Sequence, residues 1–136
     1  MIFIDSNIPM YLIGNDQNYK NKVQKTLNDL VHNDVKLVTS VEVFQEIIYR
    51  YSKINRLDVL DDVFERLTTI VDNIFSTTLH DIILAKENTK LYCGKMSSRD
   101  CLHLATMINN NVYTIYSFDQ GFDMVKNIKR ITSVPY

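Results

Sequence analysis

Apolar and polar residues follow one another along this chain in blocks that predict strands alternating with amphipathic helices. Continuous apolar runs at residues 1–4 and 112–118 are typical of strands covered on both faces, as in a parallel sheet flanked by helices. We expect the second run to form the central strand. Shorter runs predict further strands at residues 36–39, 69–71 and 128–132.

Between these runs, apolar residues recur at the three- and four-residue spacing of helices. The helices are expected to begin near Asn7, to begin after Asp16, and to occupy residues 41–51, 57–67, 79–92 and 98–109. Strands that alternate with helices build βαβ units. The expected fold class is therefore α/β, a three-layer α/β/α sandwich with a central, mostly parallel sheet.

Length and composition indicate one domain spanning residues 1–136. The chain has no repeat, low-complexity tract or glycine-rich linker, and 136 residues can bury a sizeable core. No apolar stretch approaches the ~20 residues that cross a bilayer, and no cleavable leader is evident, so we expect a cytoplasmic protein without membrane contact. Cys93 and Cys101 are expected to be small core residues, with a bridge across the turn at Gly94 as the alternative.

Two of the predicted strands run directly into an aspartate. Asp5 follows the first strand, within the polar run that ends at Asn7, and Asp119 follows the strand at 112–118. In an open parallel sheet, ligands bind beyond the carboxyl ends of the strands, so the two carboxylates should meet at one site. Because like charges at close range repel, either a proton is shared there or a divalent cation binds.

Further polar residues could join the same edge of the sheet. Asp100 opens the last long helix at the edge of its apolar stripe, although a capping box with Ser97 would explain it if it stood alone. Ser117 points to the same side of its strand as Asp119 and can donate a hydrogen bond to a carboxylate. For Asp123, an N-cap and a role at the site are equally good interpretations.

Glu46 and His103 are weaker candidates by pattern alone. Glu46 falls outside the apolar arc of the helix at 41–51, so periodicity favours a solvated side chain, and Glu42 competes with it on the same helix. His103 stands three residues after Asp100, a spacing compatible with shared metal ligation. A structural histidine is the interpretation that we favour for it.

The candidate residues determine which chemistry the site could perform. Carboxylates with serine or asparagine and no sulfur favour Mg²⁺ or Mn²⁺, whose natural substrates are phosphate esters. The net charge of −1 does not exclude nucleic acid, because a cluster of five acids would leave 11 against 15 basic residues, about +4, on the rest of the molecule. The sequence contains no Cys/His zinc spacing, glycine-rich phosphate loop or Gly-x-Ser-x-Gly elbow.

Four sequence segments together resemble the PIN-domain ribonucleases, and most of all the VapC-type toxins of toxin–antitoxin pairs. These segments are Asp5-Ser6-Asn7, Ser40 with Glu46, Ser98-Arg99-Asp100-Cys101-Leu102-His103-Leu104-Ala105, and Ser117-Phe118-Asp119 with Phe122-Asp123. The resemblance implies an acidic metal-binding quartet of Asp5, Glu46, Asp100 and Asp119, supported by Ser117, with Asn7 and Asp123 as further candidates. It is this resemblance that places Glu46 above Glu42.

The resemblance also implies an activity and partners. It implies Mg²⁺- or Mn²⁺-dependent endonucleolytic cleavage of single-stranded RNA by metal-activated water, and a sheet in the order 3-2-1-4-5. It implies homodimers and a cognate antitoxin that docks on apolar helices and blocks the metal site. The apolar helix at 57–67 would suit such a partner, although core packing would explain it equally well.

Three alternatives stay open at this point. A stand-alone PIN-domain nuclease could process RNA outside a toxin pair. A phosphotransfer protein could use Asp5 as a nucleophile, but dehalogenase-type phosphatases have a second aspartate where this chain has Asn7. A non-catalytic module could bind RNA or protein, and it would not need the complete acidic set.

Overall fold

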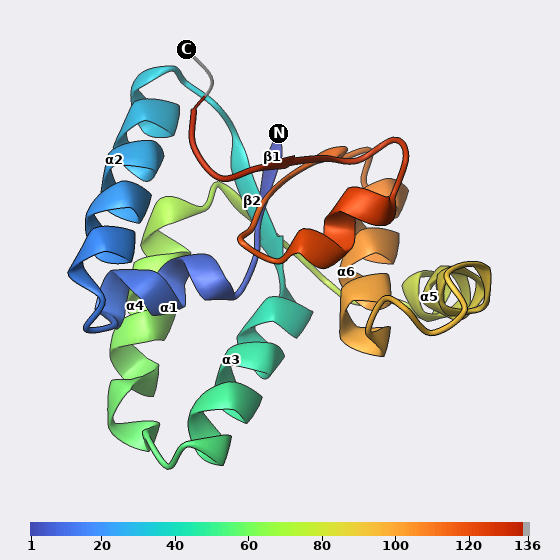
Figure 1. Cartoon of the computed structure of the whole chain (residues 1–136), viewed down its shortest axis with the longest axis horizontal. Helices are drawn as coiled ribbons and strands as arrows, with labels where there is room; N and C mark the ends of the chain where they lie inside the picture. Colours follow the sequence, from blue (N-terminus) through green and yellow to red (C-terminus); the bar gives the residue numbers. More distant parts are fainter. Residues whose placement is uncertain (135–136) are drawn as a thin grey trace.

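The computed structural model describes residues 1–134 as a parallel five-stranded sheet with helices on both sides (Figure 1). The strand order is β3-β2-β1-β4-β5, and every neighbouring pair is parallel. The strands are β1 (Ile2–Ile4), β2 (Leu37–Ser40), β3 (Asn73–Phe75), β4 (Thr114–Tyr116) and β5 (Lys129–Ile131). The predicted α/β class and the order 3-2-1-4-5 are both confirmed.

Six α-helices and two short 3-10 turns connect the strands. They are α1 (Asn7–Ile13), α2 (Gln17–His32), α3 (Val41–Lys53), η1 (Leu57–Val59), α4 (Leu60–Ile70), α5 (Leu79–Leu91), α6 (Ser98–Asn109) and η2 (Gln120–Met124). Figure 1 shows α1, α2 and α4 on one side of the sheet and α6 with α5 on the other. In the described part of the chain, no helix is long and apolar enough to cross a membrane.

The centre of the sheet forms the core of the molecule. Phe3 and Ile4 of β1 pair with Ile115 and Tyr116 of β4, and all four side chains are fully buried. Burying each such side chain contributes roughly 1.5–3 kcal/mol, which explains why these strands have no polar face. The strand β1 lies in the middle of the sheet, with β4 beside it, so the position predicted for the second strand was wrong by one place.

The edge of the sheet also differs from the sequence prediction. The predicted strand at 69–71 is wrong, because α4 continues to Ile70 and β3 begins at Asn73. The hydroxyl of Thr68 donates to the carbonyl of Phe64 at 2.9 Å, and that of Thr69 donates to Glu65 at 2.7 Å. These threonines satisfy their hydroxyl groups within the helix, so their β-branched side chains do not end it.

The two cysteines occupy different environments. Cys101 is fully buried in α6 and matches its prediction, but Cys93 is exposed, so the prediction of a core residue was wrong there. Cys93 has a φ of 52° and lies beside Gly94 in the turn between α5 and α6, where the chain faces solvent. Both thiols are free, so the alternative of a bridge between them is also wrong.

Candidate active site

Asp5 lies at the point where β1 ends and α1 begins, and its carboxylate is 3% exposed. Its Oδ1 accepts the backbone N–H of Ser6 at 2.8 Å, and its Oδ2 accepts the hydroxyl of Ser117 at 2.5 Å. Burial raises the pKa of Asp5, and the nearby Glu46 raises it further, while His103 and the two donors oppose this shift. The chain therefore holds this carboxylate in one orientation and stabilises its charge only in part.

Ser117 and Asn7 connect the ends of β1 and β4. The Ser117 oxygen accepts the backbone N–H of Asp119 at 3.0 Å and the side-chain amide of Asn7 at 3.3 Å. The amide oxygen of Asn7 in turn accepts the backbone N–H of Phe118 at 3.4 Å. Asn7 is the first residue of α1, and its side chain reaches from there to the end of β4. This network links Asp5 to the loop that carries Asp119.

Glu46 is 2% exposed on α3, so the solvated position that periodicity favoured was wrong. The helix buries Val43, Glu46 and Ile47, whereas Val41 is 45% exposed. The buried side of α3 includes the polar residue Glu46. A helix face that is drawn through apolar residues alone does not include a buried acid. Glu42, the competing candidate, lies in the first turn of α3 and lines a separate hollow with Arg99.

Both oxygens of Glu46 have cationic or polar partners. Arg50 donates to Oε2 from Nε at 3.0 Å and from Nη2 at 2.9 Å, and Nε2 of His103 lies 2.9 Å from Oε1. Burial opposes charge on Glu46, but His103 and Arg50 outweigh it and lower its pKa to about 2. Glu46 is therefore ionised at every pH at which the protein would work.

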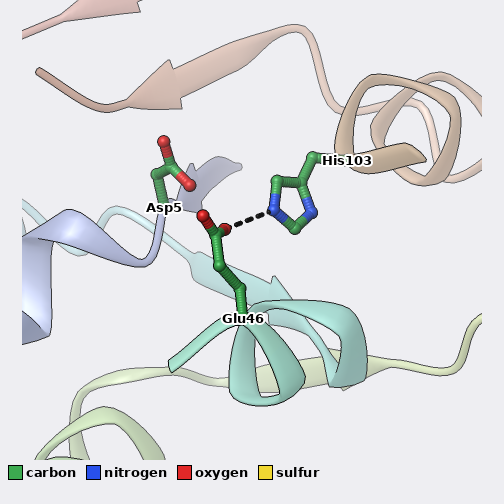
Figure 2. Close-up of side chains that lie close together, drawn as sticks. All are labelled: Asp5, Glu46 and His103. Carbon is green, nitrogen blue, oxygen red and sulfur yellow. Dashed lines mark hydrogen bonds and ion pairs between the residues drawn. The ribbon is translucent and has the colours of Figure 1, made fainter. Parts of the chain in front are cut away.

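His103 lies beside Asp5 and Glu46 and is a further candidate for the site, while the structural role favoured from the sequence stays a prediction. Figure 2 shows Asp5, Glu46 and His103 pointing toward one another from β1, α3 and α6. One potential ligand atom from each of the three lies within 4.8 Å of the other two. Burial lowers the pKa of His103, but Glu46, Asp5 and Asp100 together raise it above its ordinary value. Its spacing from Asp100 was the only signal in the sequence.

Asp100 and Asp119 form the other side of the site. Asp100 stands in the first turn of α6, and Asp119 caps η2 by accepting the N–H of Gly121 at 2.8 Å. Burial, hydrogen bonding with Asp119, and the charges of Asp5 and Asp119 raise the pKa of Asp100 to about 7. In the metal-free chain, Asp100 therefore stays protonated at slightly acid pH.

Gly121 allows the η2 turn to approach this pair. A Cβ at this position would lie 3.1 Å from Oδ1 of Asp119 and 3.9 Å from Oδ2 of Asp100. Any larger residue would push against the Asp119 carboxylate. Glycine is thus needed here for close approach rather than for an unusual backbone angle.

Asp123 forms an ion pair with Arg130 of β5. Its two oxygens accept Nε of Arg130 at 2.8 Å and Nη2 at 2.9 Å, and its side chain is 54% exposed. The N-cap interpretation was wrong, because Asp119 caps η2, whereas a role of Asp123 at the site stays a prediction.

The donor set fits a divalent cation. We name Asp5, Glu46, Asp100 and Asp119 the carboxylate cluster. Burial and nearby carboxylates raise the pKa of Asp5 and of Asp100. A cation bound beside these two groups would therefore stabilise their charged forms. Three of the four acids offer oxygen atoms that neither arginine nor lysine contacts, and oxygen donors of this kind suit Mg²⁺ or Mn²⁺.

Comparison with known proteins agrees with this geometry. A sequence model of the PIN domain matches residues 2–128. Ribonuclease VapC13 of Mycobacterium tuberculosis is 37% identical over 131 residues, covering 96% of this chain and 99% of that protein. The crystal structure of M. tuberculosis VapC20 superposes with a TM-score of 0.76 at 18% identity, covering 95% of this chain and 98% of VapC20.

A toxin–antitoxin complex provides a further structural match. The VapBC2 structure from Rickettsia felis, bound to a DNA fragment from its promoter, has a TM-score of 0.74 at 18% identity and covers 96% of this chain and 98% of the matched chain. At this identity the two structural matches bear on the fold alone. The family match and the identity to VapC13 go further: this chain belongs to the PIN-domain family and, within it, to the VapC ribonucleases.

Proposed function

We propose that this chain is the toxin of a toxin–antitoxin pair and cleaves single-stranded RNA endonucleolytically with the help of Mg²⁺ or Mn²⁺. The supporting observation is that Asp5, Glu46 and His103 each offer a ligand atom within 4.8 Å of the other two, and that Asp5 and Asp119 lie near enough to Asp100 to raise its pKa. Repulsion among buried carboxylates is costly, and a bound cation would relieve it. The ribonuclease activity named for VapC13 supplies the reaction class.

Each residue of the site has a role in this proposal. Asp5, Asp100, Asp119 and Glu46 would hold the cation, which when bound lowers the pKa of a water molecule and offsets the charge of the scissile phosphate. Ser117 and the Ser6 N–H orient the Asp5 carboxylate, while Arg50 and His103 keep Glu46 ionised. Because metal ligands must be deprotonated, Asp100 would lose its proton when the cation binds.

We also propose a cognate antitoxin and a homodimer. In the described residues, the apolar face of α4 is largely core, because Val63 and Leu67 are fully buried. On α5, by contrast, Leu79 is 73% and Leu91 is 69% exposed. A protein partner would cover this surface. A short open reading frame directly upstream, and a dimer mass in sedimentation, would support these two expectations.

Substitution of Asp5 provides the main test of this function. The purified chain is incubated with a labelled single-stranded RNA while Mn²⁺ is titrated, and we expect cleavage that requires the metal. Asp5→Asn should lower the rate by about a thousandfold, because several kcal/mol of charge stabilisation is lost. Asp61→Asn is the matched control, since Asp61 is exposed in the first turn of α4.

Two results would reject the proposal. Cleavage that persists without metal in a folded Asp5→Asn protein would exclude the metal-dependent mechanism. A phosphorylated Asp5, trapped after incubation with a phosphate ester, would instead identify a phosphotransfer protein. An active nuclease that is harmless when expressed in cells would favour the stand-alone RNA-processing role over the toxin.

A further inference from the structure

Three aromatic side chains pack together beside the carboxylate cluster. Tyr11 of α1 and Tyr19 of α2 are stacked, with ring centroids 4.4 Å apart and planes 11° from parallel. Phe118 meets both rings edge-on, at 5.3 Å from Tyr11 and 5.2 Å from Tyr19. We name these three residues the aromatic rim. They come from three separate segments, so the fold itself brings them together.

The aromatic rim is joined directly to the active site. Phe118 stands between Ser117, which orients Asp5, and Asp119 of the carboxylate cluster. Its backbone N–H donates to Asn7, and Tyr11 lies one helical turn after Asn7 on α1. A strand with a phosphate at the carboxylates could therefore reach Tyr11 along the hollow that Tyr11 lines together with Asn7 and Arg50.

Solvent reaches the rim from two sides. A hollow of about 170 Å³ is lined by Asn18, Tyr19, Lys22 and Phe118. Tyr11 instead lines a second hollow of about 370 Å³, which also contains Asn7 and Arg50. Tyr19 remains 39% exposed, whereas rings that serve only the core are buried.

The charge at the smaller hollow suits a polyanion, whereas Asp16 lines the larger hollow beside Tyr11. Nζ of Lys22 lies 5.4 Å from the Phe118 ring centroid at the edge of the smaller hollow, and the Lys22 side chain is exposed. A lysine beside partly exposed aromatic rings is the combination with which single-stranded nucleic acids are bound, because bases stack on the rings while the cation meets the backbone. An apolar peptide would need neither the lysine nor the link to the carboxylates.

We propose that the aromatic rim stacks a base of the single-stranded RNA next to the scissile phosphate, with Lys22 on a neighbouring phosphate. This inference rests on the proposed ribonuclease function and adds how the strand is held. Stacking is tolerant of base identity, so the rim sets the position of the strand rather than its sequence. The expected consequence is a contribution to RNA binding that is separable from the chemical step.

Tyr19 offers the sharpest test, because its ring is the most exposed of the three. In the described structure its ring packs against Tyr11 and Phe118 and not against the carboxylate cluster. Tyr19→Leu keeps an apolar side chain but removes the stacking surface, and we expect KM for a short RNA to rise about tenfold with little change in kcat. Tyr19→Phe keeps the ring and should stay within twofold of the wild type. Tyr113→Leu, at an exposed tyrosine just before β4, is the control for a general effect.

An RNA series with one abasic position at a time identifies the stacked base. In the wild type, one abasic position near the cut should weaken binding about tenfold, and in Tyr19→Leu that penalty should disappear. Binding is followed by fluorescence anisotropy of the labelled RNA, so it is measured whether or not the chain cleaves it. Melting curves confirm that each variant is folded.

The outcomes separate this inference from the function on which it rests. If the wild type cleaves RNA but Tyr19→Leu has an unchanged KM and the same abasic profile, the base-stacking role is wrong and the nuclease stands. If the wild type binds RNA through Tyr19 but never cleaves it, the stacking role stands and the nuclease proposal fails. If Tyr19→Leu weakens only binding to a co-expressed antitoxin, the rim is a protein interface and the inference is overturned.

Discussion

Glu46 on α3 and Asp100 on α6 belong to one carboxylate cluster, but their surroundings give them opposite electrostatic states. Glu46 has Arg50 and His103 against its two oxygens, and its pKa is lowered to about 2. Asp100 has another carboxyl, Asp119, as its neighbour, and its pKa is raised to about 7. One side of the site is thus permanently charged, whereas the other is charged only when a cation or a higher pH removes its proton.

This difference indicates what the loss of each acid does to the stability of the metal-free fold. Removing Glu46 leaves the buried His103 and the half-exposed Arg50 without their counter-charge, so it should damage the folded state. Removing the charge of Asp100 relieves repulsion, so it should damage only the function. The substitutions below test that distinction, from the largest expected effect to the smallest.

Glu46→Ala should lower the free energy of unfolding by about 3 kcal/mol, because His103, which is fully buried, and Arg50 lose their ion-pair partner. Urea denaturation of the metal-free protein measures this. Glu42→Ala on the same helix is the control and should change stability by no more than about 0.5 kcal/mol. Equal effects of the two substitutions would show that the Glu46 contacts do not support the fold.

His103→Gln should reduce metal-dependent cleavage by roughly 10- to 100-fold, because Glu46 loses the partner that orients its Oε1. The measurement is the Mn²⁺ concentration that gives half-maximal rate, which should rise together with the loss of activity. An unchanged metal requirement, with only a lower melting temperature, would assign His103 the structural role alone.

Asp100→Asn should raise the stability of the metal-free protein at pH 7 by about 1–2 kcal/mol, after allowance for solvent screening, while it abolishes cleavage. The pKa of Asp100 is raised from 3.8 to about 7, so the folded state binds this proton more tightly than the unfolded chain. The wild type therefore loses stability as the pH rises from about 4 to 7.

The advantage of the asparagine variant should accordingly shrink as the pH falls and vanish only well below 3.8, the ordinary pKa of the group, where the carboxyl is protonated in both states. Parallel urea titrations of the two proteins at several pH values, with a chelator present, measure the difference. A stability gain that is independent of pH would mean that packing, not charge repulsion, explains it.

The central strands of the sheet were predictable because burial on both faces requires a continuous run of apolar residues. The apolar runs around Phe3 and Ile115 and the aspartates that follow them located both the strands and the edge at which ligands bind. The edge strand β3 has no continuous apolar run, since its residues Asn73 and Ile74 are exposed. The sequence therefore predicted the wrong segment, 69–71, as a strand.

The site was harder to predict than the fold. A buried acid such as Glu46 interrupts the apolar pattern that periodicity relies on, so only the family resemblance identified it. His103 was underrated because its partner, Glu46, is 57 residues away in the sequence. Asp123 has a motif position beside the site, but the contact with Arg130 directs its carboxylate elsewhere, which no local pattern reveals.

The central claim is that the four acids form one cation site, and metal binding to the purified chain tests it most directly. Titration calorimetry with Mn²⁺, repeated near pH 6.5 in buffers of different ionisation enthalpy, reports both affinity and proton release. We predict saturable binding that releases a proton in the wild type, and loss of that binding in Asp5→Asn and Asp100→Asn. Binding of equal affinity in all three proteins, or no binding to the wild type, would contradict the account.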